Sequence, residues 1–387
     1  MRRQGTTTML WEPTPDQEIF RDTTARFIHD QAPPAELRRL RSDPTGFDAG
    51  YWHRGAELGW TSLLVAEDHG GGSLSGTGLI DLTFVAHEFG RRAAPGPLGS
   101  SNLVAAALST HYTEAHAAPL AALLAGTSTA AWCTDEPRPG SSAAGPPVDI
   151  RIEGNEVVVH GTKRPVEATP ATNLLLVTGR TGDGLSQVLV PADTPGVRVR
   201  PLRSIDVTRR YAAVDFDDVR LPVTALVGSA GDARADIEHA RRVAIVIGCA
   251  ESVGALQSVF DLTVAWAFDR YSFGRSLASY QALKHRFADM KTWLEAFHAL
   301  ADDAAAAVAA GSPDDDELSS AAQAYIGDYG GLLIQDCVQL HGGIGVTYEH
   351  DLHLFMRRAT ANRSSYGSPA EHRQLVADIA LQQEAAQ

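Results

Sequence analysis

Cysteine is scarce in this chain, which has only three residues of this type among 387. Cys133, Cys249 and Cys337 lie far apart and show none of the short spacings of metal-binding or redox-active pairs. We therefore expect no disulfide framework and no cysteine metal site, and we predict no metal site of another kind. A reducing, cytoplasmic setting fits this cysteine usage best.

Basic residues are also few. The chain has 33 Lys and Arg against 47 Asp and Glu, which gives a formal net charge of -14. The basic residues are scattered rather than gathered into a stripe, so nucleic acid is not an expected partner. A small polyanionic ligand stays compatible with this charge, because a few local arginines bind a phosphate whatever the net charge is.

Long apolar runs are missing as well. No run approaches the roughly 20 residues that a membrane span requires, and residues 1–9 lack the apolar block of a secretory signal. We expect a soluble protein without a membrane span. Residues 1–10 are predicted to form a loose leader, and the first helix is predicted to begin near Thr14, because Pro15 suits a first helical turn.

The chain is long and apolar enough for several domains, with 387 residues of which 44% are hydrophobic. The residue pattern changes twice along the chain, from helical periodicity to short β-branched runs and back. This predicts a mostly α protein with a β domain in the middle. We expect an N-terminal helical domain over residues 1–125, a middle β domain over 126–228 and a C-terminal helical bundle over 229–387. The two outer segments show helical periodicity, and Gly311-Ser312-Pro313 predicts a turn between two long helices.

The middle segment carries short β-branched runs separated by Gly, Pro, Asn and Asp. Ile150 and Ile152 alternate with polar residues, Gly154-Asn155 predicts a tight turn, and a return strand begins at Val157. Further strands are predicted at 174–177, 188–190, 197–199 and 213–216. The regular spacing predicts a small antiparallel sandwich or barrel.

Two stretches of the C-terminal segment indicate a ligand site. The first is Asp269-Arg270-Tyr271-Ser272-Phe273-Gly274, with Gln281 opening the next helix. Arg270 offers a planar, permanently charged fork that suits a pyrophosphate. Taken singly, Phe273 is typical of core filling and Gln281 of a helix cap, so only their joint arrangement favours a site.

The second stretch is Gln339-Leu340-His341-Gly342-Gly343-Ile344-Gly345. Its glycines let backbone N–H groups approach a large ligand, although isolated glycines are more often turns. Together the two stretches resemble the signatures of the acyl-CoA dehydrogenase family, an Arg-x-x-Phe-Gly turn and a Gln-x-x-Gly-Gly-x-Gly segment.

The resemblance implies that family's fold, with a C-terminal four-helix bundle, an FAD cofactor and an acyl-CoA substrate. It also implies a homo- or hetero-oligomer that passes electrons to an electron-transfer flavoprotein or a similar acceptor. In the family the arginine and the phenylalanine meet FAD from one subunit, while the glutamines and the glycine-rich loop reach it from a neighbour. The implied cofactor residues are Arg270, Phe273, Gln281, Gln339, Gly342 and Gly343.

A weaker likeness lies in the middle segment. Trp132-Cys133-Thr134-Asp135-Glu136-Pro137 resembles the family's Thr-Glu-Pro loop, which lies along the flavin ring. The family's hydroxyl position falls on Asp135, so Thr134, one residue away, is the candidate to replace it. Pro165 and Glu167 stand where many relatives place an aromatic residue and a threonine.

The implied reaction needs a carboxylate that removes an α proton from the thioester while the β hydrogen leaves as hydride. The family's usual glutamate position falls on Tyr366, and a phenol with an unperturbed pKa of about 10 is a poor base near neutrality. A second position used by some relatives falls at Ala244. Glu251, two helical turns further on the same face, is the candidate base, and chemistry assisted by Tyr366 is the alternative. Glu238, nearly two turns before Ala244, is a second acid that would point at substrate in a different helix register. An ordinary salt-bridged carboxylate is the plainer interpretation of both glutamates.

The sequence is compatible with three hypotheses. The chain is an active FAD-dependent acyl-CoA dehydrogenase with an off-pattern base, or a partner subunit that pairs with a base-bearing chain, as in heteromeric members acting on bulky steroid side chains. The third is a flavin monooxygenase on the same fold, which needs no α-proton base. Acyl chain length cannot be deduced, because small residues at 244, 248 and 254 permit either a bulky acyl group or close helix packing.

Overall fold

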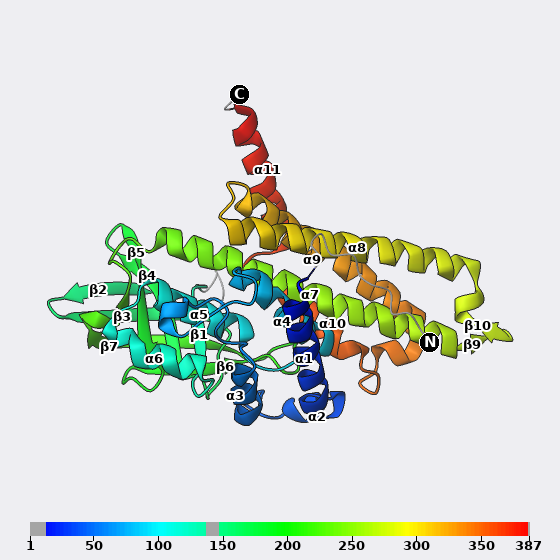
Figure 1. Ribbon diagram of the computed structural model, residues 1–387, viewed down its shortest axis with the longest axis horizontal. Helices are drawn as coiled ribbons and strands as arrows, with labels where there is room; N and C mark the ends of the chain where they lie inside the picture. The colour runs from blue at the N-terminus through cyan, green and yellow to red at the C-terminus, as the bar shows by residue number, and fades with distance from the viewer. Residues whose placement is uncertain (1–12, 137–146, 386–387) are drawn as a thin grey trace. The chain divides into compact units, whose positions relative to one another are not determined.

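The computed structural model describes residues 13–136 and 147–385 (Figure 1). The expected leader at residues 1–10 and Pro137 lie outside this part of the chain. The described residues belong to two compact units. Unit 1 comprises the chain up to Pro34, Leu79–Ala94 and the chain from Ile245 onward; unit 2 comprises Ala35–Gly78 and Pro95–Ala244. These units follow packing, whereas the three predicted domains follow the changes of secondary structure and stay a prediction.

The N-terminal segment is helical, as its periodicity predicts. Its α-helices are α1 (Pro15–Gln31), α2 (Pro34–Leu40), α3 (Ala49–Glu57), α4 (Gly78–Arg92), α5 (Leu98–Thr110) and α6 (Glu114–Leu124). The predicted start of the first helix is confirmed, with Pro15 in its first turn. The Thr14 hydroxyl accepts from the Gln17 backbone N–H at 3.3 Å, and the Gln17 side chain accepts from the Thr14 backbone N–H at 2.9 Å. This reciprocal pair is a capping box, which satisfies two N–H groups that the helix cannot.

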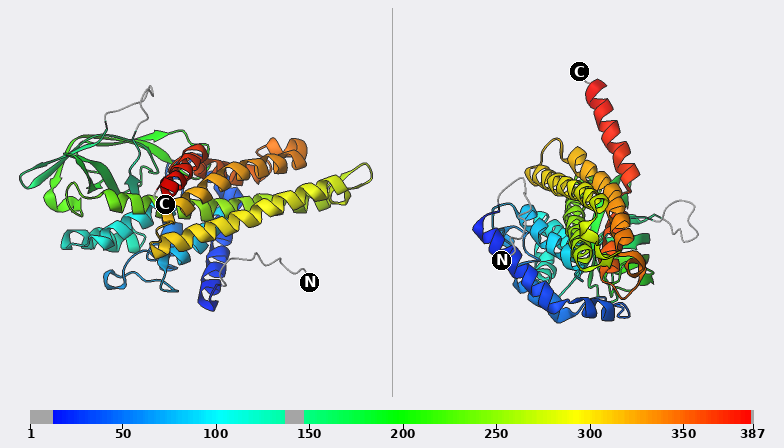
Figure 2. Two further views of the ribbon diagram at one scale, coloured as in Figure 1. Left: turned by 90° about the horizontal axis from the view of Figure 1, so that it is seen from above. Right: turned by 90° about the vertical axis from the view of Figure 1, so that its right-hand side faces the viewer.

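The middle segment forms the predicted β domain, whose strands gather in one sheet within unit 2 (Figures 1 and 2). The order is β6-β7-β3-β2-β4-β5-β8, with β1 on β4. The strands are β1 (Ala130–Cys133), β2 (Asp149–Glu153), β3 (Glu156–Val166), β4 (Leu174–Thr181), β5 (Gly184–Pro191), β6 (Val197–Leu202), β7 (Tyr211–Pro222) and β8 (Leu226–Val227). The neighbours pair antiparallel, except that β1 and one residue pair of β2 run parallel to β4, so the sheet is mixed. Buried valines such as Val157, Val177 and Val214 fill its core.

The C-terminal segment returns to helices, as predicted. They are α7 (Arg234–Asp269), α8 (Gln281–Ala310), α9 (Asp315–His341), α10 (Leu352–Asn362) and α11 (Pro369–Ala385). The short strands β9 (Tyr271–Ser272) and β10 (Arg275–Ser276) form a hairpin between α7 and α8. Helices α8 and α9 run side by side (Figure 1) after the turn at Gly311, where the sequence predicts it.

Helices α4 and α7 approach each other closely inside unit 1. A Cβ at Gly90 would lie 1.8 Å from the Glu251 carbonyl oxygen, and one at Gly254 would lie 2.0 Å from the His87 carbonyl oxygen. Only glycine permits this contact of two backbones. By contrast, a Cβ at Gly248 would meet no atom within 4 Å. Close packing therefore explains Gly254 but not Gly248.

Helix α7 is also long and apolar enough to cross a membrane by length and composition, which the expectation of no such segment missed. Most of its apolar window is buried in the protein. This burial is typical of a core helix, so the finding is weak support for a membrane span.

Candidate active site

The first motif forms the hairpin that follows α7. Phe273 and Gly274 occupy its two-residue turn with φ values of 49° and 81°. Positive φ at both positions is typical of a type I′ turn, and a bulky residue rarely adopts it. Phe273 is 97% exposed, so the interpretation as core filling is wrong. An exposed aromatic ring on a strained turn indicates a contact outside the chain's own core.

Gln281 opens α8, and its side-chain nitrogen lies 3.3 Å from the Nε2 of His285. The residue before it, Tyr280, is the N-cap and makes no side-chain capping bond. The interpretation of Gln281 as a helix cap is therefore not supported by its contacts. Tyr280 instead donates its hydroxyl to the Ser272 carbonyl at 2.7 Å, which ties the hairpin to the start of α8.

The second motif lies at the end of α9. Gln339 is exposed near the last turn, and Gly342 has a φ of 66° and a ψ of -142°, a conformation that only glycine adopts easily. A side chain at Gly345 would come within 2.7 Å of the Val338 carbonyl oxygen. Added Cβ atoms at Gly342 and Gly343 would meet nothing within 4 Å. The turn therefore packs on one side and leaves backbone open to a ligand on the other.

The two motifs converge around Trp266 of α7. The Arg270 guanidinium carbon lies 6.0 Å from the centre of the Trp266 ring, and the His341 ring stacks on the same indole at 5.4 Å. His350 packs edge-on against both rings, at 6.2 Å from Trp266 and 4.5 Å from His341. Sequence reasoning missed Trp266 and His350, because nothing in the linear pattern shows that these rings meet.

His341 is fixed in this cluster by a hydrogen bond to the backbone of α9. Its Nδ1–H donates to the Cys337 carbonyl at 2.8 Å, and burial lowers the pKa of the imidazole. Because the ring is one residue before Gly342, it anchors the glycine turn to α9 and to α7 at once. Arg270 makes no ion pair within residues 13–136 and 147–385, so its charge is available to an anion.

Glu251, the candidate base, lies in the interior of unit 1. Its side chain is 3% exposed and that of Arg358 is 1% exposed. Arg358 donates to Oε1 at 2.6 Å and Asn362 donates to Oε2 at 3.0 Å. Arg358 also donates to the carbonyls of Ala93 and Ala94, at 3.4 and 3.0 Å, just past the end of α4. Both carboxylate oxygens of Glu251 thus accept hydrogen bonds from α10, which favours a role in holding α10 on α7.

Tyr366 lies in the segment between α10 and α11 and has a φ of 59°, again a strained value for a non-glycine residue. Gln323 of α9 holds the start of this segment by donating to the carbonyls of Asn362 and Ser365, at 3.1 and 3.2 Å. The backbone that presents Tyr366 is therefore fixed by its neighbours. Glu238, the other acid considered, is exposed and lies 4.0 Å from Arg234.

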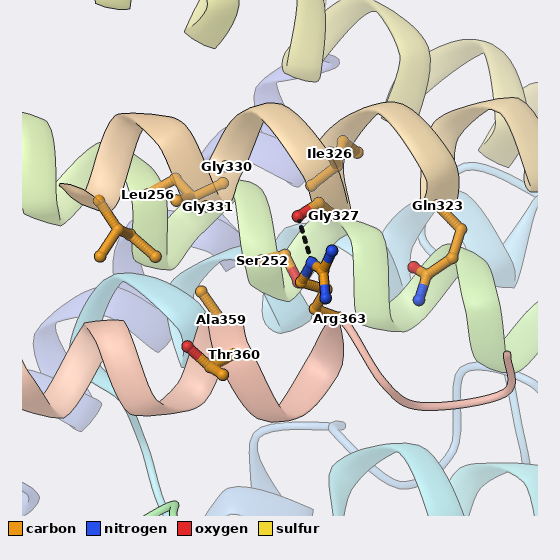
Figure 3. A pocket seen from close by; sticks show the side chains of 11 residues that line it. Ser252, Leu256, Gln323, Ile326, Gly327, Gly330, Gly331, Ala359, Thr360 and Arg363 are labelled. Carbon is orange, nitrogen blue, oxygen red and sulfur yellow. Dashed lines mark hydrogen bonds between the residues drawn. The ribbon is translucent and has the colours of Figure 1, made fainter. Parts of the chain in front are cut away.

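A hollow opens beside the same segment, between α7, α9 and α10 (Figure 3). Ser252, Gln323, Thr360 and Arg363 supply its polar side chains (Figure 3), and Arg363 donates to the Gly327 carbonyl at 2.8 Å. Ser252 donates to the Gly248 carbonyl at 2.7 Å. Since these groups already have protein partners, the hollow offers no vacant set of ligand contacts.

In unit 2, Thr134 follows β1 directly. Its carbonyl oxygen accepts from the ammonium of Lys163, at 2.9 Å. Glu167 pairs with Arg209 at 3.1 Å, so the residue that departs from the family pattern is engaged in an ion pair. His160, Asp217 and Asp218 come close enough to hold a metal ion, but all three are exposed and surface acids often gather without one.

Comparison with known proteins places the chain in a family. The model of the acyl-CoA dehydrogenase N-terminal domain matches residues 14–126, and that of the C-terminal domain matches residues 233–381. The chain is 28% identical to acyl-CoA dehydrogenase IpdE2 of Mycolicibacterium smegmatis over 94% of this chain and 99% of that protein. It is 25% identical to isobutyryl-CoA dehydrogenase of Dictyostelium discoideum, over 94% of this chain and 88% of that protein.

Solved structures show the same fold. Butyryl-CoA dehydrogenase of Megasphaera elsdenii superposes with a TM-score of 0.86 at 21% identity, covering 96% of this chain and all of that one. A glutaryl-CoA dehydrogenase of Mycobacterium smegmatis in complex with FADH2 superposes with a TM-score of 0.83 at 20% identity, over 95% of each chain. These likenesses concern the fold alone.

The chain belongs to the acyl-CoA dehydrogenase family. It is therefore an oxidoreductase of an FAD-dependent family, which confirms the fold, the class of enzyme and the cofactor that the two motifs implied. The described residues fit that cofactor. A free guanidinium, an exposed aromatic ring and an open glycine turn are the groups that a diphosphate and a flat ring system require.

Proposed function

We propose that this chain catalyses the α,β-desaturation of an acyl-CoA thioester. The observation that carries the proposal is the convergence of Arg270 and the Gly342 turn on Trp266, which brings two motifs about seventy residues apart in sequence to one end of the helical unit. When bound, FAD supplies the acceptor for the hydride that leaves the β carbon. The chain must supply binding, orientation and the fate of the α proton.

We propose the cofactor contacts from the two motifs and the family resemblance. Arg270 would pair with the diphosphate, and Phe273 would cover the cofactor from its exposed turn. By the family resemblance, Gln281, Gln339, Gly342 and Gly343 would reach a cofactor that is shared with a neighbouring subunit, and Thr134 would meet the flavin ring. The bidentate fork of Arg270 matches phosphate oxygens better than a lysine would.

The remaining step is removal of the α proton of the thioester. We propose that Glu251 acts on it only if its ion pair with Arg358 opens, because a carboxylate that already accepts from two donors is a weakened base. By the family resemblance, Tyr366 falls on the usual position of the acid, and its fixed backbone would orient the phenol toward substrate. Neither residue supplies a free carboxylate at that place.

This geometry favours a second candidate function, that of a subunit whose companion brings the base. The fold also occurs in the ChsE4-ChsE5 complex of Mycobacterium tuberculosis, which superposes with a TM-score of 0.85 at 21% identity over 95% of this chain and 98% of that one. We propose a homo- or hetero-oligomer in the cytoplasm that passes electrons to an electron-transfer flavoprotein or a similar acceptor. Relatives are named for different acyl groups, so the acyl group is left open.

The test is anaerobic bleaching of the flavin band. The chain is purified alone, and then together with candidate companion chains of the same fold. A yellow chain that bleaches alone on adding an acyl-CoA supports the first function, and colour or bleaching only after mixing supports the second. Oxygenated product with fast reoxidation in air would point to a monooxygenase. Absence of FAD uptake in both preparations would refute all three.

A further inference from the structure

Lys163 of β3 is an unusual residue in this chain. The sequence has only three lysines, at 163, 284 and 291, and Lys163 is 2% exposed. The other two lie on α8, where Lys291 pairs with Glu295 at the surface. Taking an ammonium out of water is costly unless it gains charged or polar partners, so a buried lysine indicates a specific use.

The partners of Lys163 lie in the segment that follows β1. Its ammonium donates to the Thr134 carbonyl at 2.9 Å and to Glu136 Oε1 at 3.2 Å. The same carboxylate oxygen accepts from the Val148 backbone N–H at 3.2 Å. One residue further along β3, the Arg164 backbone N–H donates to the Asp135 carbonyl at 2.8 Å. Each of residues 134, 135 and 136 is thus tied to β3, two of them by Lys163.

The pairing of β1 with β4 does not hold residues 134–136. The residues of β1 that pair with β4 are Ala130–Cys133, and the pairing stops before Thr134. Burial lowers the pKa of Lys163, and the attraction of Glu136 opposes that shift. The charge of the lysine therefore depends on the segment it holds, and the segment depends on the lysine.

We propose that Lys163 is a positioning residue that fixes the Thr134–Glu136 segment for contact with FAD. The inference rests on the proposed function, because it takes from the family resemblance that this segment lies along the flavin ring. A compact ammonium suits the task better than a guanidinium, since it donates to a carbonyl and a carboxylate that lie in different directions.

The first test needs no cofactor. Lys163→Met removes the ammonium and leaves an unbranched side chain that is one atom shorter, and Lys291→Met is the matched control at a partly exposed lysine. Hydrogen–deuterium exchange of the apo-protein should become faster in residues 131–136 of Lys163→Met and stay unchanged in the control. Unchanged exchange in Lys163→Met overturns the proposal.

The second test uses FAD. Loss of the charged donor should raise the Kd for FAD by about tenfold or more. The flavin midpoint potential should fall in Lys163→Met, which leaves Glu136 as an uncompensated negative charge, and should not fall in Glu136→Gln. Equal Kd and potential in Lys163→Met and the wild type overturn the proposal. If the wild type takes up no FAD, alone or with a companion, the proposed function fails. The exchange experiment still tests whether Lys163 holds the Thr134–Glu136 segment.

Should Lys163→Met not fold, Glu136→Gln decides the question. It keeps the bond from Lys163 to the Thr134 carbonyl and weakens the two bonds that Glu136 accepts, from Lys163 and from the Val148 backbone N–H. Faster exchange at residues 135 and 136, with a smaller change at residue 134, supports the proposal that Lys163 fixes this segment. Exchange at the wild-type rate at all three positions overturns it.

Discussion

The buried pair of Glu251 and Arg358 separates two roles that one carboxylate cannot easily combine. Removing one partner of a buried ion pair leaves the other charge unpaired, which costs about 3 to 5 kcal/mol. We therefore expect Glu251→Gln and Arg358→Met each to lower the urea midpoint of unfolding strongly. The double variant should lose less than the sum of the two, since neither charge is then stranded.

The same variants test catalysis. If Glu251 is the base, Glu251→Gln abolishes exchange of the substrate α proton with solvent even under conditions where the variant is fully folded. If it is a structural partner of Arg358, exchange persists in the folded fraction. Additive losses of stability in the double variant would contradict the ion-pair account.

His298 of α8 gives the protein a predictable response to acid. Burial lowers its pKa to about 3, and the nearby His87 adds to the shift. The folded state keeps this imidazole neutral while the unfolded chain takes up a proton below its ordinary pKa of about 6.5. Stability is therefore complete above pH 6.5 and is lost as the pH falls toward 3, by about 2 kcal/mol at pH 5.

Urea unfolding between pH 7 and 5 checks this. His298→Gln should flatten the pH dependence of the free energy of unfolding in that window, even if it lowers the value at pH 7. Glu88, whose pKa is lowered through contacts with His87 despite burial, loses its contribution to stability only as the pH falls below about 4.5, outside this window. A wild-type slope retained in His298→Gln would contradict the assignment. His341, also shifted downward by burial, would then be the next residue to test.

Single residues could be predicted from the sequence only where a motif names them. Arg270 and the Gly342 turn were found because their type and spacing carry chemistry. Arg358, Trp266 and Lys163 were missed as partners, because each acts through a residue distant in the chain. The solvent exposure of Phe273 could not be predicted from the sequence either, because an aromatic residue beside a glycine occurs both in cores and on turns.

At the scale of elements, the contact of α4 and α7 gives a prediction with a control inside one helix. Gly254→Ala places a methyl group against the His87 carbonyl, and such overpacking costs about 1 to 3 kcal/mol or more. Gly248→Ala meets no atom within 4 Å and should stabilise the protein by about 0.5 to 1 kcal/mol through helix propensity. Thermal unfolding of both variants measures the difference.

Gly248 also bears on the acyl group. If Gly248→Ala is stable but loses activity with bulky acyl-CoA thioesters more than with short ones, the open space beside α7 serves substrate. Equal loss for all chain lengths would contradict that use. Destabilisation by Gly248→Ala would contradict the packing argument itself.

Elements were more predictable than contacts between them. Thr14 and Pro15 define the start of α1, and Gly154-Asn155 defines the turn between β2 and β3, because capping and turn chemistry are local. The parallel pairing of β1 with β4 was not predicted, since pairing joins residues more than forty positions apart and leaves no local mark. The division of the helices between two units could not be predicted for the same reason. Packing such as that of α4 on α7 joins residues that lie far apart in the chain.

At the scale of the whole molecule, FAD binding should stabilise the fold by mass action. A ligand that binds only the folded protein raises its free energy of unfolding by about 1.4 kcal/mol for each tenfold rise in free ligand above the Kd. We expect the melting temperature of the chain, or of its complex with a companion, to rise steadily with FAD. Arg270→Ala should shift this dependence to higher FAD concentration by tenfold or more, because it removes a bidentate phosphate contact.

Arg234→Ala is the matched control, since Arg234 is an exposed arginine on the first turn of α7 with only a 4.0 Å ion pair to Glu238. It should leave the response to FAD unchanged. The melting temperature without FAD should be the same in Arg270→Ala as in the wild type, because Arg270 makes no ion pair in the described chain and lies on the surface. A response to FAD that is identical in Arg270→Ala and the wild type would remove this arginine from the cofactor site, and with it the convergence on Trp266 as the basis of the proposed function.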